Sequence, residues 1–324
     1  MDEKIVLDVS SKVREIHENV GTVIVGKDSV IELLLVAVLC GGHVLIEDVP
    51  GIGKTLLARS LATSLGCTFQ RLQCTPDLLP SDITGTSIFN QKLNEFEFVQ
   101  GPLFAQVVLA DEINRATPRS QSGLLEAMEE KQITVDGQTH FLPNPFLVLA
   151  TQNPIELAGT FPLPEAQLDR FLLKVQLGYP TWEEDQVILE RFASRNPIQE
   201  IRSTTDGEKL RELQGLCRQV TVSTEISQYI VNIVHATREH PYIELGCSPR
   251  GMLRLYQSSQ ALAVIRGRGY VIPDDVKHLV PFVIGHRVVT YTRGQLKGYS
   301  VEDILAEVVA SVAAPVEIEK SEDA

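Results

Sequence analysis

The chain has 324 residues, of which 44% are hydrophobic, and carries a formal net charge of −13 with a pI near 5.1. This length favours two packed domains with a sizeable hydrophobic core. The acidic balance argues against a protein whose main task is to grip a polyanion through a broad basic face.

Targeting signals and cysteines give the next indications. The N-terminus has no basic start followed by an apolar run, so no signal peptide is expected. The longest apolar run, Ile31–Cys40, contains a glutamate and is much shorter than the about 20 residues of a membrane span. The five cysteines are scattered without a C-x-x-C pair, which favours neither a disulfide framework nor a zinc site. We therefore expect a cytoplasmic protein without a membrane span.

The first predicted elements lead to a phosphate-binding loop. Residues 11–40 have apolar positions at helical spacing, interrupted at Gly21–Lys27. The apolar run Val44–Ile46 predicts a buried strand, Val49–Gly53 a glycine-bearing loop, and helical spacing resumes at Lys54. A strand, such a loop and a helix that opens on Gly-Lys-Thr form the context of a phosphate-binding loop. The alternative is a strand–turn–helix unit whose lysine is merely solvated.

The roles of individual residues in this loop follow from its chemistry. Backbone N–H groups and the helix N-terminus would hold an anion. Lys54 would add a positive charge at the β- and γ-phosphates, and the Thr55 hydroxyl would hold Mg²⁺. The residues expected to contact the nucleotide are Pro50, Gly51, Ile52, Gly53, Lys54, Thr55 and Leu56. Asp48 stands where the motif has its first glycine, which puts the entry of the loop in question, but we expect binding to survive.

Strands and helices alternate along the following residues. The predicted strands are 68–73, 106–110, 146–151 and 171–177, and the predicted helices are 118–130 and 165–170. Asp136-Gly137, between two β-leaning runs, predicts a hairpin. Residues 76–105 are irregular, which is typical of a functional insertion. The alternation predicts an α/β fold with a parallel sheet covered by helices on both faces.

The pattern changes near Gly178. From Thr181 onward no strand is predicted, and amphipathic helices are expected at 182–195, 206–219, 223–239, 249–266, 273–284 and 301–312. The sequence thus predicts a nucleotide-binding core at residues 1–178 and an all-helical domain at residues 179–324. The acidic end, VEIEKSEDA, is expected to fray.

Polar residues follow two of the predicted strands. Asp111 and Glu112 come directly after 106–110, and Asn153 follows 146–151. Parallel strands present these residues at the edge of the sheet that carries the phosphate loop. Asp111 would contact Mg²⁺ through water, Glu112 would activate the attacking water, and Asn153 would bond the γ-phosphate. The alternatives are an acidic first helical turn and a turn residue before Pro154.

Five segments in this order resemble the MoxR family of AAA+ ATPases: VPGIGKT, VVLADEINRA, LATQNPIE, LPEAQLDRF and SPRGMLRL. The resemblance runs from about residue 12 to 310. It implies an AAA+ P-loop αβα core with a five-stranded parallel sheet, a helix-2 insert at 78–105, a pre-sensor hairpin at Asp136-Gly137 and a helical lid. It also implies Mg²⁺-dependent ATP hydrolysis and a homo-oligomeric ring, expected to be a hexamer.

The resemblance assigns further residues. Arg170 matches the arginine finger that reaches the γ-phosphate of the neighbouring subunit, and Arg250 matches the sensor-2 arginine of the lid. Val25 and Gly26 would lie against the adenine, and Arg115 is a weaker candidate for a residue acting on the neighbour. From composition alone, Arg170 would be a surface or salt-bridged arginine and Arg250 an ordinary residue at a helix start.

The resemblance implies a protein partner. Relatives act as chaperones or remodellers, typically of metal-binding proteins with a von Willebrand A domain. The alternative of a DNA motor related to MCM helicases would need Lys or Arg at the hairpin tips. Residues 135–138 contain neither, and the 78–105 insert has one lysine against three carboxylates, so nucleic acid is not the expected partner. A chelatase-type motor subunit stays open.

Overall fold

The computed structural model describes residues 2–154, 159–194, 196–291 and 298–315, so the predicted frayed tail lies outside the described residues. The helices are α1 (Glu3–Gly21), α2 (Asp28–Cys40), α3 (Lys54–Ser64), α4 (Pro80–Thr84), α5 (Pro118–Glu130), α6 (Glu165–Leu168), α7 (Trp182–Ser194), α8 (Gly207–Cys217), α9 (Thr224–Glu239), α10 (Pro249–Ile265), α11 (Pro273–Ile284) and α13 (Val301–Ser311). The strands are β1 (Val44–Glu47), β2 (Phe69–Gln73), β3 (Gly85–Asn90), β4 (Glu95–Gln100), β5 (Val107–Asp111), β6 (Gln132–Val135), β7 (Gln138–Phe141), β8 (Leu147–Gln152), β9 (Leu173–Val175), β10 (Ile243–Leu245) and β11 (Val289–Thr290). Within this part of the chain, no helix combines the length and the apolar character that crossing a bilayer requires.

Five strands form one parallel sheet in the order β2-β5-β8-β1-β9, which confirms the predicted sheet. Alternate strand residues point to opposite faces, as the pleat requires. On β1, Val44 and Ile46 belong to the core under α1, α2 and α3, whereas Leu45 belongs to the core under α5. Helices therefore cover both faces, and the expected αβα core is confirmed.

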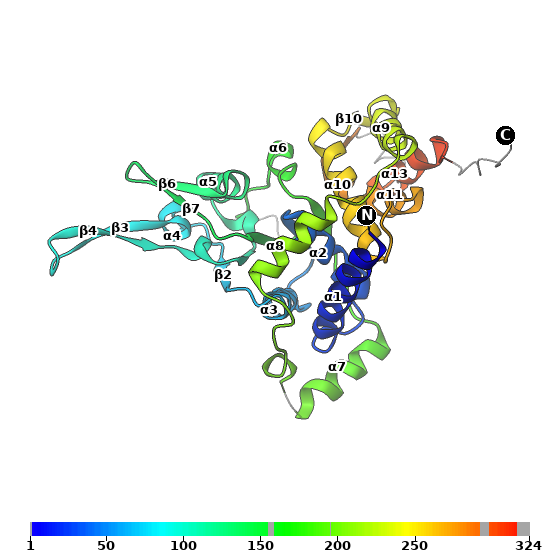
Figure 1. Ribbon diagram of the computed structural model, residues 1–324. Coiled ribbons are helices and arrows are strands. Elements are labelled where there is room, and N and C mark those ends of the chain that lie inside the picture. The colour runs from blue at the N-terminus through cyan, green and yellow to red at the C-terminus, as the bar shows by residue number, and fades with distance from the viewer. Residues whose placement is uncertain (1, 155–158, 195, 292–297, 316–324) are drawn as a thin grey trace, which may run out of the picture.

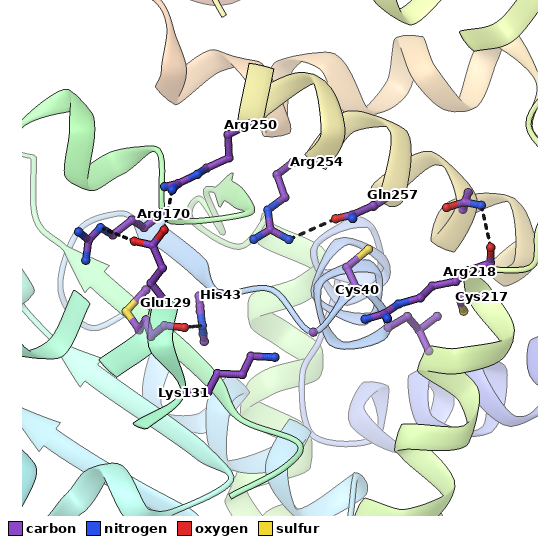
Figure 2. Close-up of a pocket in the computed structure, with 14 residues that line it drawn as sticks. Cys40, His43, Glu129, Lys131, Arg170, Cys217, Arg218, Arg250, Arg254 and Gln257 are labelled. Carbon is purple, nitrogen blue, oxygen red and sulfur yellow. Dashed lines mark hydrogen bonds and ion pairs between the residues drawn. The ribbon is translucent and has the colours of Figure 1, made fainter. Parts of the chain in front are cut away.

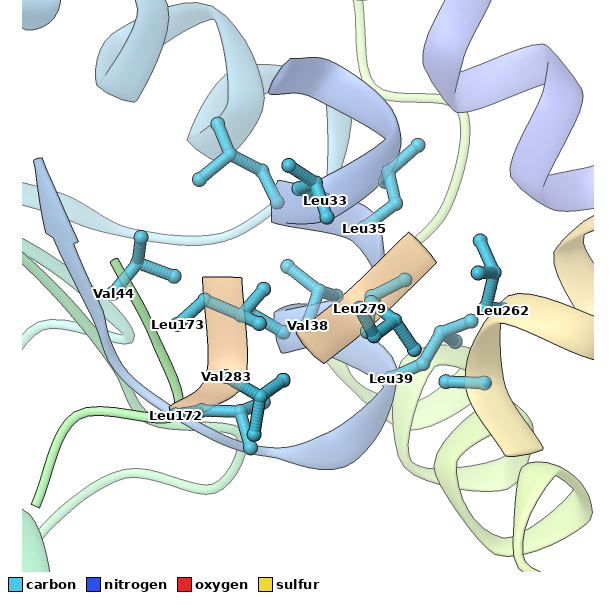
Figure 3. Close-up of a cluster of buried hydrophobic side chains, with 14 of the residues drawn as sticks. Leu33, Leu35, Val38, Leu39, Val44, Leu172, Leu173, Leu262, Leu279 and Val283 are labelled. Carbon is cyan, nitrogen blue, oxygen red and sulfur yellow. The ribbon is translucent and has the colours of Figure 1, made fainter. Parts of the chain in front are cut away.

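The core beneath α1 and α2 continues into the C-terminal helices. Figure 3 shows Val38 of α2 between Leu173 of β9 and Leu279 of α11, and Leu39 of α2 on the side of Leu262 of α10. Because α2 is apolar on nearly all sides, it is suited to this central position. The expected boundary near residue 178 stays a prediction, since the hydrophobic core runs across it without a break. Helix α7 lies apart from the other C-terminal helices (Figure 1).

Two hairpins, β3–β4 and β6–β7, project from the sheet on the same side of the molecule (Figure 1). The second contains the predicted Asp136-Gly137 turn, where both residues have positive φ. The first lies in the segment that the sequence indicates as irregular, but its strands are regular and six residues long. The rings of Phe98 and His140 stack at 4.0 Å and connect the two hairpins.

The C-terminal helices agree with the predicted ranges to within two residues at each end. One expectation is wrong: β10 and β11 form an antiparallel pair in a region predicted to be helical throughout. Strands of three and two residues are too short to produce a recognisable alternation. Helix α1 also begins at Glu3 rather than near residue 11, with Val6 and Val9 buried and the Asp2 side chain capping its first turn at 2.9 Å.

Candidate active site

The loop between β1 and α3 presents backbone donors to one point. Gly51 and Gly53 have φ values of 87° and 92°, a conformation that residues with a Cβ rarely adopt. Helix α3 begins at Lys54, and no side chain caps its N-terminus. The first N–H groups of a helix have no partner within the helix. They are therefore available to an anion, which the positive end of the helix dipole also favours.

The side chain of Lys54 lies inside this loop and is 9% exposed. Its Nζ donates to the carbonyl oxygen of Asp48 at 2.7 Å. Burial lowers the pKa of Lys54, while the negative charges of Asp111, Asp48 and Glu112 oppose this shift. The carboxylates at the carboxyl end of β5, Asp111 and Glu112, are thus close enough to Lys54 to act on its charge, as the parallel topology predicts.

Asp48, which replaces the first glycine of the motif, has a structural role. Its Oδ1 accepts the backbone N–H of Val49 at 2.9 Å. Its Oδ2 accepts the N–H groups of Leu177 at 2.8 Å and Gly178 at 2.7 Å. The carboxylate therefore joins the entry of the phosphate loop to the segment that leaves β9.

A pocket of about 430 Å³ opens beside the loop, between residues 23–27, the loop itself and α7. Six residues predicted to bind nucleotide line it: Val25, Pro50, Gly51, Ile52, Gly53 and Leu56. Gly26 lies between Val25 and Lys27, which both line the pocket. The walls are mainly apolar, with Asp185 as a carboxylate acceptor. Such a pocket fits a purine base whose phosphates reach the start of α3, where Thr55 lies in the first turn.

Asp111 ends β5 and is 8% exposed. Its Oδ1 accepts the Thr151 hydroxyl at 2.7 Å, and its Oδ2 accepts Nη2 of Arg71 at 2.6 Å. Thr151 lies on β8 and Arg71 on β2, the two strands that flank β5. The neighbouring strands therefore fix the orientation of this carboxylate.

Glu112 has φ 58° and ψ 51°, a left-handed conformation that turns its side chain away from the path of the strand. Its Oε2 forms an ion pair with Nη1 of Arg115 at 3.0 Å and accepts Nε2 of Gln73 at 3.3 Å. The structure thus places Arg115 on Glu112 of its own subunit. Asn153 follows β8 at the same edge of the sheet, and its carbonyl accepts Nδ2 of Asn114 at 3.3 Å.

Arg170 and Arg250 lie at the opposite edge of the sheet from Lys54. Arg170 precedes β9, and its neighbour Leu172 donates to the carbonyl of His43, the residue before β1. The four residues of β1, about 13 Å of strand, separate that edge from the phosphate loop. Neither arginine lines the nucleotide pocket of its own subunit.

One carboxylate holds the two arginines together (Figure 2). Glu129, at the end of α5, pairs with Nη2 of Arg250 at 2.5 Å and with Nε of Arg170 at 3.3 Å. Asp169 fixes the backbone behind them. It accepts Nε of the buried Arg287 at 2.8 Å, and the hydroxyl of Ser248, which caps α10, at 3.2 Å. The turn that carries Arg170 and the helix that carries Arg250 therefore form one unit.

The residues that orient the predicted site residues were not identified from the sequence. These are Arg71, Gln73, Glu129, Asp169 and Arg287. Polar residues on 68–73 could have indicated a contact with Asp111, but only if the strand order had been known. Glu129 gives no such signal, because its partners are distant in sequence and its neighbour Glu130 is also acidic.

The comparisons with known proteins agree with this geometry. Residues 43–173 match the model of the ATPase family associated with various cellular activities (AAA), and residues 235–308 match the AAA lid domain. A crystal structure from Cytophaga hutchinsonii, described as that of a presumed ATPase, superposes with a TM-score of 0.91 at 38% identity, covering 97% of this chain and 98% of that one. Fold and site define an AAA+ ATPase, an enzyme that hydrolyses ATP.

The relatives specify the family. The Bacillus subtilis protein YeaC, which is uncharacterized, is 48% identical over 93% of this chain and 94% of its own length. The Mycobacterium tuberculosis chaperone MoxR1 is 42% identical over 97% of this chain and 85% of its own length. The chain belongs to the MoxR family of AAA+ ATPases, as the sequence motifs predict.

Proposed function

We propose that this ATPase works as a homo-oligomeric ring, expected to be hexameric, in which each site is shared between two subunits. The observation that carries the proposal is the separation of Lys54 from Arg170 and Arg250, at opposite edges of one sheet. If both arginines contact a γ-phosphate, that phosphate belongs to a neighbour. An interface between two different faces repeats around a closed ring.

In the composite site, the phosphate loop of one subunit holds ATP through its backbone N–H groups and Lys54. Thr55 and Asp111 would hold Mg²⁺, which neutralises charge on the phosphates. Asp111 would act through water, and the phosphate oxygens and further waters would supply the remaining ligands. Glu112 orients and deprotonates the attacking water, and Asn153 bonds the γ-phosphate.

We propose a protein as the partner of the ring. The β3–β4 hairpin exposes several large apolar side chains, at Ile88, Phe89, Leu93, Phe96 and Val99, and Phe141 is exposed on β7. The rings of Phe89 and Phe96 form a cross-strand pair 5.4 Å apart, and Phe96 is 74% exposed. Phe141 on the second hairpin is 76% exposed, and exposed apolar side chains of this kind are typical of protein contact sites. We infer that the ring is a chaperone or remodeller, as its relative MoxR1 is named, and that it acts in the cytoplasm on proteins with a von Willebrand A domain.

Partner capture with a variant that binds but does not hydrolyse ATP tests this proposal. Glu112→Gln replaces the carboxylate of the base with an uncharged amide of the same shape, so ATP is bound but not hydrolysed. We expect this variant to retain a protein partner, and the added changes Phe89→Ser and Phe96→Ser to abolish retention while ATP binding is unchanged. Retention that persists without both aromatic rings would refute the hairpin as the contact site.

The alternative of a DNA motor has less support. The hairpin tips that project from the molecule present apolar and acidic side chains, with Lys92 the one basic residue between β3 and β4. Gripping a phosphate backbone needs several such charges. Recovery of DNA rather than protein with the Glu112→Gln variant would favour the motor. A chelatase-type subunit would be indicated by capture of a separate chelatase partner.

A further inference from the structure

A second cavity, of about 180 Å³, lies at the amino edge of the sheet. It is enclosed by the ends of α2, α5 and α8 and by one face of α10 (Figure 2). Five basic side chains line it: Lys131, Arg170, Arg218, Arg250 and Arg254. Glu129 is the one carboxylate in the lining. In a chain with a net charge of −13, this excess of positive charge is local and concentrated.

The basic residues fall into two groups. Arg170 and Arg250 are both paired with Glu129. Lys131, Arg218 and Arg254 have no carboxylate within ion-pair distance in the described part of the chain. Arg254 donates to the side-chain oxygen of Gln257 at 3.2 Å, which leaves its charge uncompensated.

The uncompensated charges face a common space. Figure 2 shows Arg254 extending from α10 and Lys131 extending from the end of α5 toward the region of His43. Burial lowers the pKa of His43 to about 4, and the charges of Lys131 and Arg254 act in the same direction. Arg254 and Arg218 both act on the thiol of Cys40, whose pKa burial raises to about 12. The base of the cavity is therefore uncharged at neutral pH.

We propose that this cavity binds a phosphoryl or pyrophosphoryl group through Arg254, Lys131 and Arg218, three lining cations without a carboxylate partner among the described residues. Guanidinium groups bind phosphate oxygens through paired N–H donors, and the volume admits a group of this size. Arg254 lies four residues beyond Arg250, about 6 Å along the helix axis, so this subsite adjoins the pair on Glu129 within the same cavity.

Two sources share this chemistry: a free anion from solution and the triphosphate of a neighbouring subunit, of which the second rests on the proposed ring. The test uses full-length protein with Lys54→Ala, which disables the phosphate loop, diluted to single subunits. Inorganic pyrophosphate is titrated by calorimetry at low ionic strength. We expect Arg254→Gln to weaken binding about tenfold or more. Lys131→Gln, at an exposed position, serves as a second variant, and Arg14→Gln on the exposed face of α1 as the matched control.

The outcomes separate the two sources. Pyrophosphate binding that weakens in Arg254→Gln and Lys131→Gln, but not in Arg14→Gln, identifies a free anion. Unchanged pyrophosphate binding, together with a raised KM for ATP in concentrated Arg254→Gln protein whose Lys54 is intact, identifies the neighbour's triphosphate. If Arg254→Gln changes neither the binding of pyrophosphate nor the KM for ATP, the proposal is overturned. Full activity of Arg170→Ala would refute the composite site without altering the pyrophosphate result.

Discussion

The carboxylate of Asp48 accepts the backbone N–H of Gly178 at 2.7 Å, which joins two points 130 residues apart in the chain. The first point is the entry of the phosphate loop, and the second lies just before α7, whose residue Asp185 lines the nucleotide pocket. A residue that departs from the motif therefore connects the two walls of this pocket. A glycine at this position would leave the N–H groups of Leu177 and Gly178 without this acceptor.

Restoring the motif should therefore harm the protein. We expect Asp48→Gly to lower the free energy of unfolding by about 2–3 kcal/mol, at roughly 1 kcal/mol for each of the three lost hydrogen bonds. It should also raise the KM for ATP several-fold, because the pocket walls lose their connection. Denaturant unfolding and steady-state kinetics measure the two effects. Asp48→Asn, which keeps one acceptor oxygen, should be intermediate, and an unchanged Asp48→Gly protein would contradict this role.

Local patterns predict much of the fold and one half of the candidate site. The strand, loop and helix around Lys54 follow from the spacing of neighbouring residues. Asp111, Glu112 and Asn153 follow from a general property of parallel sheets. The contact of Asp48 with Gly178, and the pairing of Arg250 with Glu129 across 121 residues, depend on how distant elements pack. No local periodicity contains that information.

Arg170→Ala should keep ATP binding and lose turnover. Its guanidinium lies far from the phosphate loop of its own subunit, so binding by Lys54 should not change. An arginine that stabilises the transition state accounts for about 10³–10⁵ in rate where it has been measured. Nucleotide binding is measured by calorimetry and turnover by phosphate release. Wild-type turnover of the variant at every protein concentration would rule out a role in the neighbour's site.

Mixing two inactive variants should restore part of the activity. Lys54→Ala retains its arginines, and Arg170→Ala retains its phosphate loop. At each interface of a randomly mixed ring, one subunit has an intact phosphate loop with a probability of one half, and its neighbour has an intact arginine with the same probability. About a quarter of the interfaces should therefore combine both. Phosphate release is measured after mixing and compared with each variant alone. The double variant Lys54→Ala/Arg170→Ala, mixed with wild type, controls for simple dilution.

Acid should destabilise the protein through His43. Above pH 6.5 the ring is neutral in both folded and unfolded chains. Below pH 6.5 this histidine becomes protonated in the unfolded chain. In the folded chain it stays neutral down to about pH 4, because burial disfavours the charged ring. Stability is therefore lost as pH falls through this window, at about 1.4 kcal/mol per pH unit from this group.

Unfolding curves between pH 7.5 and pH 5 measure this effect. His43→Gln should be less stable than wild type at pH 7.5, since the ring accepts the N–H of Val148 at 3.0 Å. Its stability should, however, depend less on pH. His235→Gln, at an exposed histidine of α9, should keep the wild-type slope. Equal slopes for all three proteins would exclude His43 as the source.

The hydrophobic core that α2 shares with the sheet and with α10 and α11 has a consequence for folding. Two segments that match separate family models should melt together, because neither can bury its apolar face without the other. We expect a single calorimetric transition whose van't Hoff and calorimetric enthalpies agree. Residues 1–178 expressed alone should bind hydrophobic dyes and aggregate, and two resolved transitions would contradict this. The chain would then fold and unfold as a single cooperative unit.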